Sequence, residues 1–184
     1  RFRNVTGVQT CALPIYMNTY VYASVDGGSN FRSIGEGIPK GHAVMSMAED
    51  PKNPNVLYSG SEFGLFVSPN RGGSWTRVKS MVPSVPIHEI VFHPRDNDMI
   101  LATHGRSIWI LDDATPLQQY PEAIKSDAFL FDLRPAMQFN PANDRGFLAD
   151  KPFFGRNPTY GAPISFYLAK DRKSTRLNSS HVSE

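Results

Sequence analysis

The sequence predicts an all-β fold made of repeated four-stranded antiparallel sheets, and three patterns lead to this prediction. Short apolar segments rich in Val, Ile, Tyr and Phe alternate with turns rich in Gly, Pro, Asn and Asp, which is typical of successive β-strands. The chain also repeats itself, because a shift of 43 positions places residues 56–58 on 99–101 and residues 64–67 on 107–110. A period of this size in a strand-rich sequence indicates a repeat architecture.

The third pattern is a turn signature, Ser-x-Asp/Asn-x-Gly-x-x-aromatic, which occurs twice, 44 positions apart. A short acidic or amide side chain accepts hydrogen bonds from backbone amides of its own turn, glycine adopts positive φ, and the aromatic ring anchors the next strand. We therefore assign a structural role to this turn, and a catalytic or calcium-binding role for its aspartate is the weaker alternative. The two copies consist of Ser24, Asp26, Gly28 and Phe31, and of Ser68, Asn70, Gly72 and Trp75.

The two ends of the sequence differ in character from its interior. Residues 5–15 resemble the translation of a common sequencing-library adapter, and residues 171–181 resemble the translation of the reverse complement of that adapter. Scars of this kind are excluded from fold reasoning, so we expect residues 1–15 and 171–184 to be adapter-derived artefacts. The natural part is then residues 16–170, which we expect to be a fragment of a longer gene.

Excluding the ends changes the charge of the chain. Residues 16–170 contain 14 Lys and Arg against 15 Asp and Glu, a formal charge of −1, whereas the whole chain carries +2. We expect no nucleic-acid partner, because such binding needs a basic surface. The only cysteine, Cys11, falls in the adapter-derived part. No apolar run approaches the roughly 18 residues of a membrane span, so we expect none.

Within the natural part we expect three sheet units, of which the first is partial. Residues 16–34 supply only the strands on either side of the first turn signature. Residues 42–80 supply a complete unit that contains the second signature. Its four strands are expected at residues 44–48, 56–61, 65–68 and 75–79.

The third unit is expected to span residues 87–135, and its turn signature is lost at residues 111–116. Loss of the signature is typical of a terminal repeat. Residues 136–162 are rich in Asn, Asp, Gly and Pro and are predicted to form a linker, after which residues 163–170 are predicted to begin a new domain. The strands of the third unit are expected at residues 87–92, 99–103, 107–111 and 128–133.

These features resemble a known architecture. Four-stranded units of about 43 residues that carry this turn signature resemble the blades of a β-propeller of the Asp-box, or BNR, class. Residues 91–98 and 103–113 are similar to the last blade of large secreted bacterial proteins described as sortilin-like or as BNR glycosyl hydrolases, and residues 154–162 are similar to their passage into an Ig-like β-sandwich. The resemblance implies a partial propeller of about two and a half blades, followed at residues 163–170 by the start of that sandwich. The chain departs from the family pattern at Asn70 and Phe31 and in the missing third box.

The resemblance also implies where a ligand binds. In such propellers the boxes lie at the base of each blade, and the loop between the second and third strands points to the ligand. The candidates on these loops are Glu62 and Phe63 in the complete unit and His104 and Arg106 in the third. His104 and Arg106 carry the donors that bind a carboxylate or the hydroxyls of a sugar or peptide.

Each candidate has a structural alternative. We favour a structural role in which Arg106 pairs with Asp112 or Asp113 and locks the blade. Glu62 is a weak catalytic candidate as one half of a glycosidase carboxylate pair, but a lone exposed acid in a hairpin turn is commoner. Residues 96–98, Asp-Asn-Asp, resemble a metal loop but lack the glycine and the distal glutamate of a calcium site. We therefore predict turn chemistry there, with no metal and no cofactor.

Two functional hypotheses follow. We favour an extracytoplasmic binding module that presents its loops to a peptide, protein or glycan, because the sequence shows no paired catalytic carboxylates. The alternative is a glycoside hydrolase acting on a polysaccharide, with a catalytic pair that these residues do not contain. A purely structural cell-surface module is a third possibility. The resemblance implies a secreted, periplasmic or cell-surface location, and it implies that the missing blades of a longer chain are partners.

Overall fold

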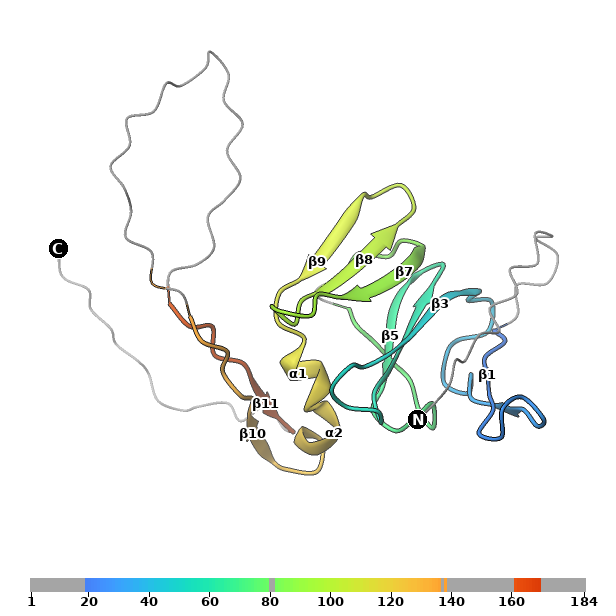
Figure 1. Cartoon of the computed structure of the whole chain (residues 1–184), viewed down its shortest axis with the longest axis horizontal. Helices are drawn as coiled ribbons and strands as arrows, with labels where there is room; N and C mark the ends of the chain where they lie inside the picture. The colour runs from blue at the N-terminus through green and yellow to red at the C-terminus, as the bar shows by residue number, and fades with distance from the viewer. Residues whose placement is uncertain (1–18, 80–81, 137, 139–160, 170–184) are drawn as a thin grey trace, which may run out of the picture.

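The computed structural model describes residues 19–79, 82–136, 138 and 161–169 (Figure 1). Antiparallel strands dominate this part of the chain, and its two helices have four residues each, α1 (Thr115–Gln118) and α2 (Tyr120–Ala123). The predicted all-β class is therefore confirmed. The strands form four separate sheets among the described residues, and none of these sheets closes on itself. The predicted adapter-derived ends lie outside the described residues.

Two of the sheets match the first two predicted units. The first sheet pairs β1 (Tyr22–Ala23) with β2 (Arg32–Ser33) on either side of the first turn signature. The middle sheet is a complete four-stranded antiparallel unit in which the strands follow chain order. Its strands are β3 (Val44–Glu49), β4 (Leu57–Ser61), β5 (Gly64–Ser68) and β6 (Thr76–Arg77).

The third sheet has three strands, β7 (Ile87–Phe92), β8 (Met99–Thr103) and β9 (Ile108–Leu111). The prediction that residues 128–133 add a fourth strand to this sheet is wrong. Instead, β10 (Ala128–Leu130) pairs antiparallel with β11 (Phe166–Leu168). The chain leaves the sheet because it turns after β9 at Asp113, with φ of +60°, and enters α1 and α2.

The middle and third sheets repeat each other in detail. Both first strands carry a β-bulge at the same place, between Val44 and Ser46 in β3 and between Ile87 and Glu89 in β7, 43 positions later. The second strands, however, are related by 42 positions. Ala48 pairs with Tyr58, whereas Val91, which is the equivalent of Ala48, pairs with Ile100. A one-residue slip moves a side chain to the opposite face of a strand. Tyr58 is therefore equivalent to Ile100, and not to Leu101 as the shift of 43 suggests.

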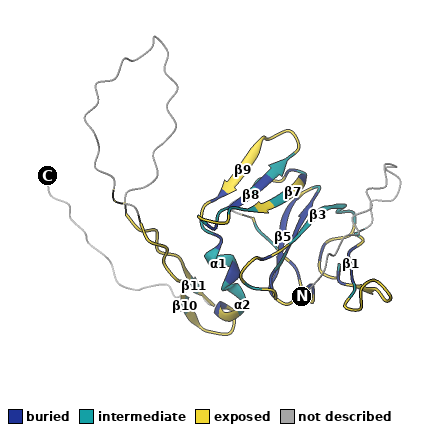
Figure 2. Ribbon diagram, in the orientation of Figure 1, coloured by how far each residue is buried: buried dark blue, intermediate teal, exposed yellow. Residues whose placement is uncertain are grey.

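The three sheets pack face to face in chain order, so the middle sheet is covered on both sides. Phe66 and Trp75 belong to a core shared with the first sheet, while Leu65 and Val67 belong to a core shared with the third sheet. Successive residues of a strand point to opposite faces, so this alternation along β5 is what two covered faces require. Figure 2 shows β5 in the colour of buried residues, in contrast to β9.

The middle and third sheets approach closely at Gly60. The Ser46 hydroxyl donates to the Ile87 carbonyl at 3.0 Å across this contact. A Cβ atom on Gly60 would lie 2.2 Å from Ser46 Oγ and 2.7 Å from Ile87 O, which is too close for any larger residue. The absence of a side chain at Gly60 therefore lets the two sheets touch.

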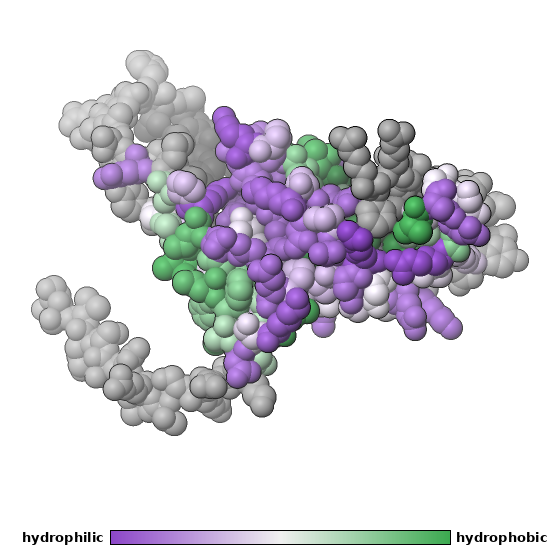
Figure 3. All heavy atoms as spheres, turned by 60° about the horizontal axis from the view of Figure 1, so that its bottom comes forward, coloured by the Kyte–Doolittle hydropathy of each residue, from purple (hydrophilic) through white to green (hydrophobic). Residues whose placement is uncertain are grey.

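The β10–β11 ribbon stands apart from the three stacked sheets (Figure 1). It exposes Leu130 and Phe166, with 62% and 65% of their surfaces accessible. Figure 3 shows a hydrophobic patch on the side where Figure 1 places this ribbon. Residues 163–170 thus contain a strand, and their assignment to an Ig-like β-sandwich stays a prediction.

Candidate functional site

The turns that link β4 to β5 and β8 to β9 lie at the same end of the middle and third sheets, which we call the hairpin end (Figure 1). Strands β3 and β7 both begin at this end, and they pack side by side. The structure therefore brings both predicted pairs of candidates to one end of the stack. These residues are Glu62 and Phe63 in one turn and His104 and Arg106 in the other.

Phe63 lies over a group of polar side chains. Its ring is 42% exposed and meets the His42 ring edge to face at 4.8 Å. Its carbonyl accepts a hydrogen bond of 2.6 Å from Arg77 Nη2. Three buried atoms around it, Glu62 Oε2, His42 Nδ1 and Arg77 Nε, have no hydrogen-bond partner among the described residues. Buried polar atoms are nearly always paired, so this group is not explained by the fold alone.

The second turn presents its side chains to solvent. The His104 ring lies 5.7 Å from the His88 ring, and both residues are exposed. The Arg106 side chain makes no hydrogen bond or ion pair within the described residues, and only its carbonyl is engaged, by Trp109 Nε1 at 3.0 Å. The favoured pairing of Arg106 with Asp112 or Asp113 is therefore wrong. The whole of β9 separates the two acids from the turn.

The two box segments, residues 24–31 and 68–75, lie at the opposite end of the strands, which we call the box end. In the first segment, Ser24 Oγ donates to Asp26 Oδ1 at 2.8 Å and accepts from the Gly28 amide at 2.8 Å. The Asn30 amide donates to Asp26 Oδ1 at 3.0 Å. Hydrogen bonds from the Asn30 backbone and side chain, and then from Ser24, lower the pKa of Asp26 from 3.8 to about 2.

The second segment makes the same bonds at the same positions. Ser68 Oγ donates to Asn70 Oδ1 at 3.1 Å and accepts from the Gly72 amide at 2.8 Å, and the Ser74 amide donates to Asn70 Oδ1 at 2.8 Å. Trp75 is buried, and its indole nitrogen donates to the Ile34 carbonyl of the first sheet at 2.6 Å. The equivalent Phe31 of the first segment is exposed.

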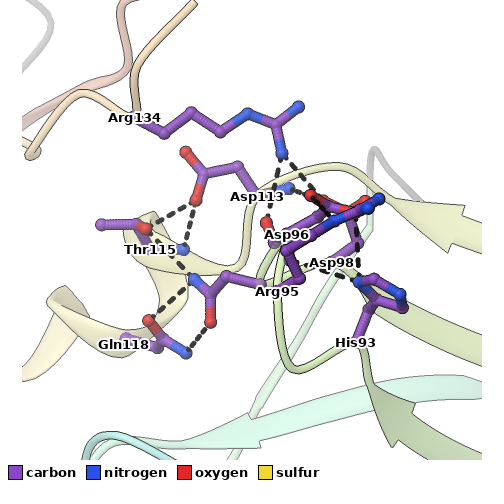
Figure 4. Close-up of polar contacts among 9 residues, drawn as sticks. His93, Arg95, Asp96, Asp98, Asp113, Thr115, Gln118 and Arg134 are labelled. Atoms are coloured by element: carbon purple, nitrogen blue, oxygen red, sulfur yellow. Dashed lines mark hydrogen bonds and ion pairs between the residues drawn. The ribbon is translucent and has the colours of Figure 1, made fainter.

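The third unit keeps part of this chemistry although its signature is lost. Asp113 lies 43 positions after Asn70. Its carboxylate accepts from the Thr115 hydroxyl and from the Thr115 amide, the latter at 3.1 Å, where the chain enters α1 (Figure 4). The signature search missed this residue because the serine and the glycine are absent. A carboxylate two residues after the end of the third strand was the signal available in the sequence.

The turn between β7 and β8 forms a polar cluster beside Asp113 (Figure 4). Arg95 Nη2 lies 2.7 Å from Asp96 Oδ2, and His93 Nδ1 lies 3.1 Å from the same oxygen. The hydrogen bond from Arg95 lowers the pKa of Asp96, and Asp96 in turn raises the pKa of Arg95. Both side chains are engaged within the turn, in keeping with turn chemistry.

The other two residues of the Asp-Asn-Asp run tie the third sheet to the segments that follow it. The Asn97 and Gln118 side-chain amides bond to each other reciprocally at 3.0 and 2.9 Å. Asp98 Oδ1 accepts from Arg134 Nη1 at 2.9 Å and from the Asp113 amide at 3.0 Å. These bonds engage the Asn97 side-chain amide and one carboxylate oxygen of Asp98. Within the described residues, no group of three or more His, Cys, Asp or Glu is placed to hold a metal ion.

A buried carboxylate that sequence reasoning passed over holds the equivalent turn of the middle sheet. Asp50 is 4% exposed and accepts from the Tyr58 hydroxyl at 2.8 Å and from the Lys52 and Asn53 amides at 2.8 and 2.9 Å. Burial, followed by the neighbouring charge of Asp50, raises the pKa of Tyr58 well above its usual range. The tyrosine therefore stays a neutral donor.

A polar cleft at the box end was also missed. It has a volume of about 640 Å³ and lies between the β3–β4 turn, the two helices and residues 132–135. Its lining includes the cations Lys52, Lys125 and Arg134 and the anions Glu122 and Asp132. Arg134 is held by Asp98, and Asp132 accepts from Gln119. The cleft depends on the tertiary position of the helices, so no local sequence signal could reveal it.

Comparison of the chain with protein-family models, with curated proteins and with solved structures finds no match. Neither helix in the described part of the chain is long and apolar enough to cross a membrane.

Proposed function

We propose that the chain is part of a ligand-binding module, and that the ligand, a peptide, protein or glycan, contacts the hairpin end. One contrast supports this proposal. At the box end, the side chains of Asp26, Asn70 and Asp113 accept hydrogen bonds from backbone amides of their own turns. At the hairpin end, His104 and Arg106 are exposed and make no side-chain hydrogen bond within the described residues. Side chains that do not stabilise the fold are the ones available to a ligand.

The chemistry of the hairpin end fits a ligand with acidic or hydroxyl groups. Arg106 offers a fork of donors that matches a carboxylate, and the neighbouring histidines act as donors or acceptors toward hydroxyls. Phe63 adds an exposed aromatic ring for an apolar face of the ligand. We further propose that the three sheets are consecutive blades of an Asp-box β-propeller that acts outside the cytoplasm. The repeated bulge and the repeated box bonds support this proposal.

The test is binding of the full chain to glycan and peptide arrays, followed by titration of the strongest ligand. Arg106→Ala and His104→Ala should each weaken binding by about tenfold, since a bond to a charged group contributes roughly 1.5 kcal/mol or more. Arg95→Ala is the matched control, because Arg95 is an exposed arginine at the box end. Equal losses in Arg95→Ala and Arg106→Ala would show that the hairpin end is not the site.

Hydrolysis of a polysaccharide, with Glu62 as acid or base, is the alternative. It needs a second carboxylate within about 10 Å across a cleft. The carboxylates of Asp50, Asp96 and Asp113 are engaged at the other end of the strands from Glu62. Release of reducing sugar that disappears in Glu62→Gln would favour the hydrolase over the binding module.

A further inference from the structure

Buried polar atoms without a partner gather around the turn between β4 and β5, residues 62–63. Four buried side-chain nitrogen or oxygen atoms lack a hydrogen-bond partner among the described residues, and three of them belong to His42, Glu62 and Arg77. Glu62 precedes Phe63 in the turn, the His42 ring packs on the Phe63 ring, and Arg77 donates to the Phe63 carbonyl. Because buried polar atoms are nearly always paired, this concentration at one turn indicates a role beyond the fold.

Each of these three groups also presents a polar atom at the surface. Glu62 Oε1, His42 Nε2 and Arg77 Nη1 form no hydrogen bond within the described residues, and they are not among the buried atoms. A carboxylate oxygen only accepts, a guanidinium nitrogen only donates, and an imidazole nitrogen does one or the other. The turn therefore offers a ligand an acceptor, a donor and an adaptable group around one aromatic ring.

The backbone of the turn is fixed by several hydrogen bonds. The Phe63 amide donates to Ser61 Oγ at 3.2 Å, and Ser61 Oγ donates to the Gly64 carbonyl at 3.0 Å. Arg77 donates to the Phe63 carbonyl and to the Ser84 hydroxyl, so it fastens the turn to the connection between β6 and β7. A site that is fixed before its ligand arrives loses less conformational entropy on binding. All of these residues belong to the complete middle unit or to the connection that follows it.

We infer that the ligand of the hairpin end is a glycan, and that an uncharged sugar ring stacks on Phe63 with its hydroxyls on Glu62 and Arg77. This inference rests on the function proposed above and narrows the ligand to one class. The Phe63 ring is 42% exposed and can cover the apolar face of a sugar. A sugar hydroxyl both donates and accepts, so neighbouring hydroxyls satisfy the free carboxylate oxygen and the free guanidinium nitrogen together.

The charges at this turn select against ionic groups. Glu62 and Arg77 carry opposite charges, so their formal sum is zero. A ligand carboxylate placed here would lie beside the Glu62 carboxylate, and a ligand ammonium group would lie beside the Arg77 guanidinium. Like charges at such short range repel each other, whereas a neutral hydroxyl avoids both conflicts. A glycan with neutral rings therefore fits this turn better than an acidic or basic peptide.

Isothermal titration calorimetry of the full chain with three kinds of probe tests this inference. The first is a set of neutral hexasaccharides of glucose, xylose and mannose. The second is the hexasaccharide of galacturonic acid, in which every ring carries a carboxylate, and the third is a glutamate-rich peptide of similar length. At least one neutral hexasaccharide should bind at probe concentrations up to ~1 mM, and about tenfold more tightly than either acidic probe.

Four variants with matched controls locate the binding. Phe63→Ala should weaken binding of the neutral hexasaccharide by about tenfold, while Phe63→Tyr keeps the ring and should change it by less than about threefold. Phe31→Ala is the control, because it removes an exposed phenylalanine at the box end. Glu62→Gln keeps the shape but loses the charged acceptor, and should weaken binding by about tenfold. Its control is Glu122→Gln, at an exposed glutamate of α2 that should leave binding unchanged.

The outcomes separate this inference from the proposed function. Loss of neutral-glycan binding in Phe63→Ala and Glu62→Gln, with binding retained in Phe63→Tyr and both controls, supports the inference. It is overturned, while the binding module stands, if only the acidic probes bind or if glycan binding depends on Arg106 and not on Phe63. Absence of binding to every probe also overturns it, and the arrays described above then decide the proposed function separately. Because Phe63→Tyr and Glu62→Gln preserve side-chain shape, unchanged thermal unfolding of these two variants excludes misfolding as the cause.

Discussion

Replacement of Asp50 by alanine should destabilise the chain more than replacement of any exposed acid. The Asp50 carboxylate is buried and is the acceptor for the Tyr58 hydroxyl and for two amides of the β3–β4 turn. Tyr58 is fully buried in the core between the middle and third sheets. Without Asp50, its hydroxyl has lost its acceptor in a place that solvent does not reach.

The size of the effect follows from these contacts. A buried donor left without an acceptor costs about 1–3 kcal/mol, and each lost hydrogen bond to the turn amides costs roughly 0.5–1.5 kcal/mol. Asp50→Ala should therefore lower the free energy of unfolding by about 3 kcal/mol. Tyr58→Phe keeps the ring against Phe92 but leaves Asp50 Oδ2 without its donor, and a hydrogen bond to a charged group contributes roughly 1.5–3 kcal/mol, so this variant should cost about 2 kcal/mol.

Urea denaturation followed by tryptophan fluorescence measures both effects. In the double variant Asp50→Ala/Tyr58→Phe no hydroxyl is left without an acceptor. The double variant should therefore lose less stability than the sum of the losses in the two single variants. A change of less than ~0.5 kcal/mol in Asp50→Ala, the range of ordinary surface substitutions, would refute this reasoning. So would strictly additive losses in the double variant.

Three further predictions concern the sheets and boxes. Gly60→Ala should cost about 2 kcal/mol in the same denaturation assay, because the new Cβ would lie 2.2 Å from Ser46 Oγ, and an unchanged midpoint would exclude the close approach of the two sheets. Ser68→Ala, at a fully buried serine, should cost about 1–2 kcal/mol, while Ser24→Ala in the exposed first box should cost less than ~0.5 kcal/mol, and equal losses would contradict the difference in burial. The folded pKa of Asp26 lies below its ordinary 3.8, so its bonds stabilise the first box above that pH and are lost as the pH falls through about 2. An NMR titration of the Asn30 amide should therefore have its midpoint near pH 2, and a midpoint near 3.8 would contradict these bonds.

The local chemistry of the chain could be predicted from its sequence. Short apolar segments bounded by turn residues located β3 to β9, including β5, in which every residue is buried because both faces are covered. The box signature identified turns whose hydrogen bonds involve only residues a few positions apart. Interactions between residues that are close in the sequence can be recognised from the sequence alone.

Features that depend on register or on distant segments could not be predicted in this way. The shift of 43 assigned Tyr58 to Leu101. The β7–β8 turn is one residue shorter than the β3–β4 turn, and the β8–β9 loop is one residue longer than the β4–β5 loop, so the two differences cancel over the whole unit. Residues 128–133 have the pattern of a strand, but the pattern does not say that the partner is β11. The role of Asp50 and the polar cleft likewise depend on tertiary contacts.

In the candidate site, too, the local turns could be predicted from the sequence but the contacts between distant segments could not. Hairpin turns at residues 62–63 and 104–106 were predictable, as was their position at one end of the strands. The expected partner of Arg106 was wrong, because sequence proximity of Asp112 does not reveal that β9 runs fully extended between them. The contact of Phe63 with His42 joins segments that no local pattern connects.

The central claim is that successive sheets of this chain stack face to face as copies of one unit. Nuclear Overhauser contacts between the middle and third sheets test it most directly. We predict strong cross-peaks between the Gly60 α-protons and the Ile87 γ2-methyl group, and between the rings of Tyr58 and Phe92, whose centroids lie 5.2 Å apart. Their absence from a spectrum that shows the Tyr58–Val67 contacts within the middle sheet would contradict the stacking.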